Sequence, residues 1–161
     1  MTTTPAEFES MLREAVRKAQ EAAPRAVDDL VRCASKVAEA VAGVTGGAAA
    51  LELVPVEGGG RTPTYQLQLR KVDSDAPPAD LGIFCVTEAG YPVLRWWSRA
   101  KWEQAPGRPD EQHTTFSELE GHFKWMLSKP ESTLVVLVTF FQQQSAANQE
   151  PATGEQPKGK K

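Results

Sequence analysis

The sequence contains few residues suited to redox, metal or acid–base chemistry, because it has only two cysteines and two histidines in 161 residues. Cys33 lies in a helical pattern and Cys85 in an apolar strand pattern, where a lone cysteine usually behaves as a small buried hydrophobe. A disulfide between these two residues remains an alternative, but nothing indicates a small secreted protein that disulfides hold together. An apolar strand is also a poor setting for a reactive thiolate.

The chain also lacks a long apolar segment and a strong net charge. Its longest apolar run, Leu134–Phe141, is far shorter than the ~20 residues that cross a bilayer as a helix. Residues 1–20 are charged from Glu7 onward and contain no apolar signal-peptide core. The net charge of −3 gives no global attraction to nucleic acid or to membranes. We therefore expect a cytoplasmic protein that binds no membrane, and the alanine- and arginine-rich composition suggests a bacterial one.

No motif for phosphate binding, zinc binding or nucleophilic catalysis is present. The glycines at 58–60 lie between strand patterns and lack the GK[ST] of a phosphate loop, so we expect a flexible turn. The residues that could ligate a metal are Asp110, Glu111, His113, Glu118 and His122. Because HExxH and CxxC spacings are absent, we interpret them as a solvated polar face. The sequence thus predicts no metal site, no cofactor and no catalytic residue.

The residues that are present suffice for one ordinary globular domain. Hydrophobic residues make up 40% of the chain and charged residues 24%. At this length one hydrophobic core can stabilise the fold without disulfides or metals. We predict a single domain over residues 1–141. From residue 142 onward the composition is too polar to offset the entropy of ordering, which predicts a disordered polar tail over residues 142–161.

Two helices are indicated by their first residues. Thr4-Pro5-Ala6-Glu7 is a capping box with proline at the first helical position, and apolar residues follow at helical spacing. Pro24 interrupts this pattern, which then resumes as far as the glycines at 43–47. We predict a kinked helix or a helix pair there. A second capping box, Thr115–Glu118, begins a helix that Pro130 ends.

Four strands are predicted between these helices, over residues 50–56, 65–72, 81–87 and 91–97. Tyr65–Val72 alternates apolar and polar residues, so one of its faces is buried. Short connections favour an antiparallel meander, and Ser98–Gln112 is predicted to be a loop. Leu134–Phe141 is apolar throughout and β-branched, which is typical of a central strand. The predicted fold class is α+β, an antiparallel sheet with helices on one face.

The segment Tyr91–Trp102 is the most informative about function, because it combines three tryptophans and three basic residues with no acid. Strand alternation places Leu94 and Trp96 in the core and Arg95 and Trp97 outside. An exposed arginine–tryptophan pair is typical of protein-binding surfaces and of platforms for single-stranded nucleic acid. The alternative is that the tryptophans pack locally under the following loop.

Trp125 lies on the wrong side of its predicted helix. The apolar stripe of that helix consists of Phe116, Leu119, Phe123, Met126 and Leu127. On a helical wheel Trp125 falls about 150° from the centre of this stripe. It therefore needs another cover, which is a second subunit, another protein, or the loop that carries Trp102.

These features predict a non-enzymatic protein-binding domain, an adaptor or accessory subunit that acts with a protein partner or as a homodimer. The predicted contact residues are Arg95, Trp97, Arg99, Lys101, Trp102 and Trp125. The alternative is a single-stranded nucleic-acid-binding protein that stacks bases on segment 91–102 and contacts phosphates through Arg70 as well. An enzyme is the third interpretation, and it would need a cleft in which carboxylates such as Asp110 or Glu118 meet.

Overall fold

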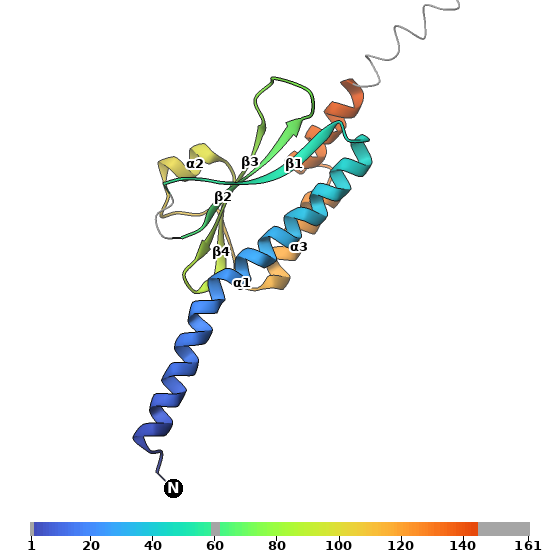
Figure 1. Cartoon of the computed structure of the whole chain (residues 1–161). Coiled ribbons are helices and arrows are strands. Elements are labelled where there is room, and N and C mark those ends of the chain that lie inside the picture. The colour runs from blue at the N-terminus through green and yellow to red at the C-terminus, as the bar shows by residue number, and fades with distance from the viewer. Residues whose placement is uncertain (1, 59–61, 145–161) are drawn as a thin grey trace, which may run out of the picture.

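The computed structural model describes residues 2–58 and 62–144 and has the predicted α+β class (Figure 1). The helices are α1 (Pro5–Thr45), α2 (Arg99–Gln104), α3 (Phe116–Ser128) and a further helix over residues 133–144. The strands are β1 (Ala49–Pro55), β2 (Thr64–Lys71), β3 (Ala79–Thr87), β4 (Gly90–Trp96) and β5 (Glu111–His113). Most of the predicted glycine turn and of the predicted tail, residues 59–61 and 145–161, lies outside the described residues.

Helix α1 is continuous over 41 residues, so of the two predicted alternatives the helix pair is wrong, and the kink at Pro24 stays a prediction. The capping box is confirmed, because the backbone N–H of Glu7 donates to Thr4 Oγ1 and Glu7 Oε2 accepts from the Thr4 N–H. Pro24 lies inside the helix on its exposed side, where the carbonyl left without a donor can bind water. The helix ends at Gly46, whose φ of 62° is in the left-handed region that favours glycine.

The strands form one antiparallel meander in the order β1-β2-β3-β4-β5. The four predicted strands are confirmed to within two residues. The predicted loop Ser98–Gln112 is wrong in two places, because it contains α2 and most of β5. Neither element has a readable pattern: α2 is short and buries no residue, and β5 is a three-residue polar edge strand.

The apolar run 134–141 forms a helix, so the predicted central strand is wrong. Ser132 caps this helix, since its Oγ accepts from the Val135 N–H at 3.2 Å and donates to the Met126 carbonyl at 2.7 Å. The side chains that face the core are Leu134, Leu137, Val138 and Phe141, whereas Val136 and Phe140 are exposed. That spacing is helical, and an unbroken apolar run conceals it because its outward positions are apolar too.

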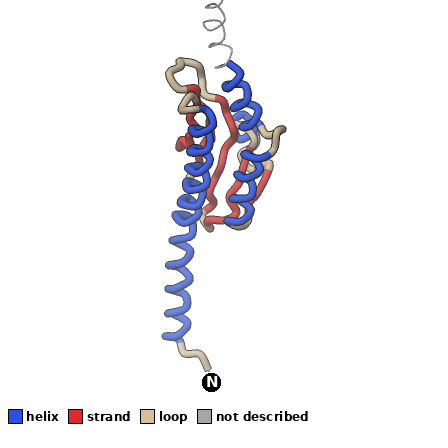
Figure 2. The backbone as a smooth tube through the Cα atoms, turned by 90° about the vertical axis from the view of Figure 1, so that its right-hand side faces the viewer, coloured by secondary structure: helices blue, strands red, loops and turns tan. Residues whose placement is uncertain are grey.

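The main core lies between one face of the sheet and the helices. Figures 1 and 2 show α1 and α3 over the same side of the sheet. Tyr91 ties α1 to β4, because its hydroxyl donates to Asp29 Oδ2 at 2.8 Å. The fully buried members of this core are Ala26, Leu30, Leu67, Phe84, Val86, Val93 and Leu119. Leu67 and Leu69 confirm the buried face predicted for the second strand.

The opposite face of the sheet carries a smaller apolar cluster. Ile83, Cys85 and Trp96 are buried there, and Trp102 of α2 packs against them. The strand alternation predicted for β4 therefore assigns its side chains to the correct faces. Both faces are covered at this point, however, so Arg95 on the helical side is 7% exposed and the prediction that it lies outside is wrong.

Candidate functional site

Arg95 is the centre of a polar cluster between the sheet and α3. It pairs with Phe84 of β3 on one side and with Glu111 of β5 on the other. Its Nη2 donates to the Leu81 carbonyl at 2.8 Å, and its Nη1 lies 2.7 Å from His122 Nε2. Its guanidinium also covers the Phe84 ring at 5.1 Å. Arg95 is thus a buried cation held by these contacts. The prediction that it is a surface contact residue is wrong.

Glu111 connects this cluster to both histidines and to an exposed tryptophan. Its Oε1 accepts from the indole N–H of Trp97 at 2.9 Å. Its Oε2 lies 3.6 Å from His113 Nε2 and 3.5 Å from His122 Nδ1. These residues come from β4, β5 and α3, and β-strand pairing of Arg95 with Glu111 sets their spacing.

Both histidines are held in the neutral form. Burial, followed by the charge of Arg95 and the neighbouring His113, lowers the pKa of His122 to about 3. Burial is also the main cause that lowers the pKa of His113, and the nearby Glu111 carboxylate only partly opposes it. At neutral pH the imidazole of His122 can therefore accept one hydrogen bond and donate another.

Glu111, His113 and His122 lie close together, and two histidines with a carboxylate are a ligand set that transition metals use. Arg95 can only donate, which makes His122 Nε2 the acceptor and leaves the proton on Nδ1. Nδ1 is the atom that faces Glu111, and a metal bound there would need its lone pair free. The geometry fits a hydrogen bond from Arg95 to His122, with the protonated Nδ1 turned toward Glu111, better than it fits a metal centre.

The other two proposed metal ligands lie outside the cluster. Glu118 accepts from the backbone N–H and the hydroxyl of Thr114, at 3.0 and 2.8 Å. Asp110 accepts from the backbone N–H of Trp97 at 2.8 Å and pairs with Lys101 at 3.4 Å. Both carboxylates therefore stabilise the local backbone. Neither lines the cleft that the enzyme interpretation requires.

A pocket of about 380 Å³ opens beside the polar cluster. Trp97 and Trp125 both line it, although they come from β4–α2 and from α3, and they are 53% and 42% exposed. Both rings are held from behind: His122 stacks on Trp125 at 6.1 Å, and the Lys101 ammonium lies 4.7 Å from the Trp97 ring centre. The remaining lining residues are Asp80, Leu81, Arg95, Glu111, His122, Met126, Ser132, Thr133 and Leu134.

The remaining predicted contact residues have separate roles. Trp102 packs under α2 against the smaller apolar cluster, as the local-packing alternative proposed. Arg99 and Lys101 are exposed and pair with Glu103 and Asp110. Of the six predicted residues, Arg95, Trp97 and Trp125 thus meet at one pocket. Sequence reasoning missed the partners that hold them, because Leu81, Glu111 and His122 are on three different elements.

The polar atoms of the pocket are largely engaged with one another. Glu111 is bonded through one oxygen and faces two imidazoles with the other, and His122 is bonded to Arg95. Asp80 accepts from the backbone N–H groups of Gly82 and Arg99. These contacts hold the polar side chains of the pocket in fixed positions.

Comparisons of the chain with protein-family models, with curated proteins and with solved structures find no match. Inference about its function therefore rests on the site itself.

Proposed function

We propose that this chain is a non-enzymatic protein-binding domain, an adaptor or accessory subunit, whose partner docks at the pocket between Trp97 and Trp125. The observation that supports this most is that two tryptophans, 28 positions apart in the sequence, are both half-exposed on one pocket. Tryptophan is one of the residue types enriched among the few residues that carry most of the binding energy in protein interfaces. Large exposed aromatic groups that no other element covers mark interaction sites.

The partner that fits is a protein segment that inserts an apolar or aromatic side chain. The inner wall supplies Leu81, Met126 and Leu134, and the mouth supplies the two indoles. Because His122 and Lys101 already hold those rings in place, little side-chain entropy is lost on binding. The carboxylates of Asp80 and Glu111 at the wall favour a segment with donors beside its anchor.

Single-stranded nucleic acid is a weaker candidate. Arg95 is buried, so it cannot serve as a surface phosphate contact. Three further basic residues proposed for phosphates already pair with carboxylates: Arg70 with Glu52, Arg99 with Glu103, and Lys101 with Asp110. Binding of a phosphate would have to compete with each of these pairs.

A cytoplasmic location is part of the same proposal. Its support is that Cys33 and Cys85 are both buried and unpaired, which suits a reducing compartment. In the described part of the chain, no helix combines the length and the apolarity that a membrane span requires.

The test compares Trp125→Ala with Leu127→Ala. Both residues are on α3 and both are 42% exposed, but only Trp125 lines the pocket. A protein captured by the wild-type chain is purified and its dissociation constant is measured with each variant. We expect Trp125→Ala to weaken binding by at least about tenfold and Leu127→Ala to leave it unchanged. Equal binding by both variants would exclude the pocket as the docking site.

A further inference from the structure

The N-terminal part of α1 forms an arm that packs on no other element of the described chain. Figures 1 and 2 show this part of the helix projecting beyond the sheet and α3. Every residue from Pro5 to Gln20 is exposed, and burial begins only near Ala22. The exposed side chains include Phe8 at 60%, Met11 at 63%, Leu12 at 65% and Val16 at 46%. Its exposed apolar side chains are therefore available to a partner.

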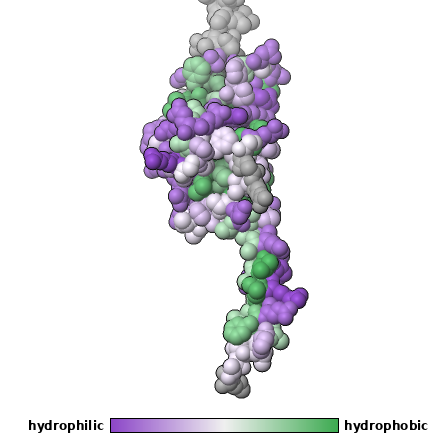
Figure 3. Space-filling view, turned by 90° about the vertical axis from the view of Figure 1, so that its left-hand side faces the viewer, coloured by the Kyte–Doolittle hydropathy of each residue, from purple (hydrophilic) through white to green (hydrophobic). Residues whose placement is uncertain are grey.

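The apolar stripe of the arm continues the stripe that binds the sheet. Along the buried part of α1 the core residues recur at intervals of three and four, from Ala26 through Leu30 to Val37 and Val41. The same intervals continue backwards through Ala19, Ala15, Leu12 and Phe8. Figure 3 shows this stripe as green atoms along one side of the projecting helix. The arm thus presents a core-type surface where no core exists.

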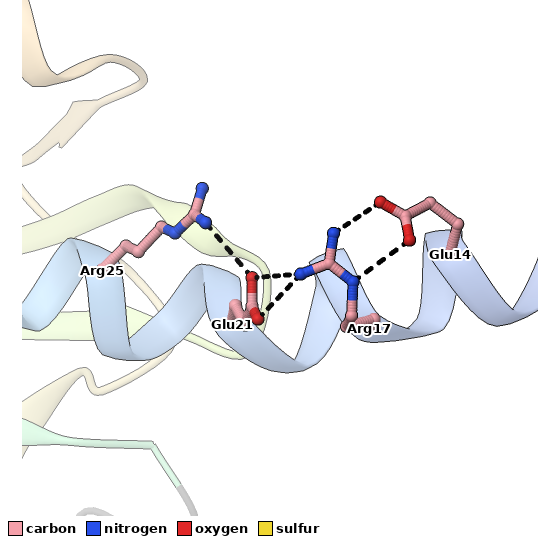
Figure 4. Close-up of polar contacts among 4 residues, drawn as sticks. All are labelled: Glu14, Arg17, Glu21 and Arg25. Atoms are coloured by element: carbon pink, nitrogen blue, oxygen red, sulfur yellow. Dashed lines mark hydrogen bonds and ion pairs between the residues drawn. The ribbon is translucent and has the colours of Figure 1, made fainter.

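The other side of the arm is occupied by ion pairs within the helix. Arg17 binds Glu14 on one side and Glu21 on the other, and Arg25 also binds Glu21 (Figure 4). On a helical wheel these four residues lie about 145° from the stripe. They stiffen the helix and lie away from the apolar stripe, so the stripe is the surface available for docking.

The two halves of the arm differ in side-chain size and in charge, so the arm is complementary to a second arm that runs in the opposite direction. Three of its four large exposed apolar side chains, Phe8, Met11 and Leu12, lie in the first half, whereas the second half carries Val16 with the small Ala15 and Ala19. Charge follows the same division. Residues 5–14 contain three carboxylates and one arginine, a net charge of −2, and residues 15–25 contain three basic residues and one glutamate, a net charge of +2.

We propose that two copies of this chain pair through their arms in antiparallel orientation. Phe8 of one copy then packs on Ala19 of the other, and Leu12 packs on Ala15, so large side chains meet small ones. Each acidic half also lies against a basic half. Parallel pairing would set large against large and like charge against like charge. Residues 5–22 overlap over about 27 Å, which leaves the two sheets at opposite ends of the paired arms.

This pairing is an isologous, closed contact that uses each arm fully. The pairing involves no residue of the Trp97–Trp125 pocket, so its test is independent of the test of the proposed function. A dimer would carry two such pockets, one at each end, and would bind a multivalent partner with higher avidity than a monomer.

The first experiment measures the mass of the full chain in solution by light scattering after size exclusion. We expect twice the 17.5 kDa of one chain. Leu12→Glu places a charge in the stripe and should give a monomer, because it leaves the other copy's apolar side chains facing a carboxylate. Ser10→Glu is the matched control, because Ser10 is on the opposite side of the same arm. Both variants should keep the wild-type tryptophan fluorescence spectrum, since all four tryptophans are in the body and neither residue contacts it.

The orientation is tested by disulfide trapping in the full chain, whose Cys33 and Cys85 are both buried. A mixture of Phe8→Cys chains and Ala19→Cys chains should form a mixed disulfide dimer under mild oxidation. Phe8→Cys alone should not crosslink to itself, because the two positions are separated by most of the arm. A monomeric wild-type chain, a dimer that survives Leu12→Glu, or self-crosslinking of Phe8→Cys would each overturn the proposal.

Discussion

Gly90, the first residue of β4 after the β3–β4 turn, lies directly against the backbone of α1. A Cβ atom at this position would come within 2.5 Å of the Ala22 carbonyl oxygen and 2.9 Å of its carbonyl carbon. The φ of Gly90 is also +87°, which an L-residue rarely adopts. Gly90→Ala should therefore carry two separate costs, one from its own backbone and one from the contact with α1.

The two costs can be separated with a second glycine. Gly46, at the end of α1, has a φ of +62° and open space around its missing Cβ. Gly46→Ala should lower the free energy of unfolding by about 1–2 kcal/mol, the cost of a left-handed alanine. Gly90→Ala adds a clash worth about 1–3 kcal/mol, so its total loss should be about 2–5 kcal/mol.

The assay is urea-induced unfolding followed by tryptophan fluorescence, with the slope of the transition compared between variants. Because the closest atoms are backbone atoms, trimming Ala22 to glycine should not rescue Gly90→Ala. Equal losses for Gly90→Ala and Gly46→Ala would refute the reasoning. That result would mean that α1 is not held against the β3–β4 turn at Ala22, where the free arm begins.

Two further predictions concern the core and the polar cluster. Leu134→Ala should lower the free energy of unfolding by about 2–5 kcal/mol. Val136 is on the same helix and is 54% exposed, so Val136→Ala should change this free energy by less than about 0.5 kcal/mol. Equal losses in urea titrations would contradict a helix that buries one side only. The pKa of His122 is about 3 in the folded protein against 6.5 as the ordinary value, so protonation favours unfolding. The stability from this group is present above about pH 6.5 and is lost as pH falls, by up to about 1.4 kcal/mol per unit. His122→Gln should flatten that slope between about pH 7 and pH 5, and an unchanged slope would assign it to other groups.

The sequence allowed the two tryptophans of the pocket to be predicted as exposed residues, but not that they line one pocket. Trp125 is conspicuous as an indole on the polar side of its helix, and Trp97 as one beside basic residues. Their meeting at one pocket depends on β5, whose three polar residues carry no strand pattern. Arg95 was predicted at the surface because alternation gives the face of a side chain and not what covers that face.

Local interactions explain what the sequence by itself determined. The capping boxes, the alternation of β2, the β3–β4 turn and the glycines after α1 specify their elements within a few residues, so periodicity and turn chemistry predict them. The continuity of α1 and the helix over 133–144 were decided by the tertiary structure. An apolar run can bury one face as a helix or two faces as a strand, and the choice depends on which neighbouring surfaces are free. The five strands pair one after another, so no position inside the sheet is open to a central strand. The side of the core next to α1 and α3 accepts a helix, because Leu134 and its neighbours pack there.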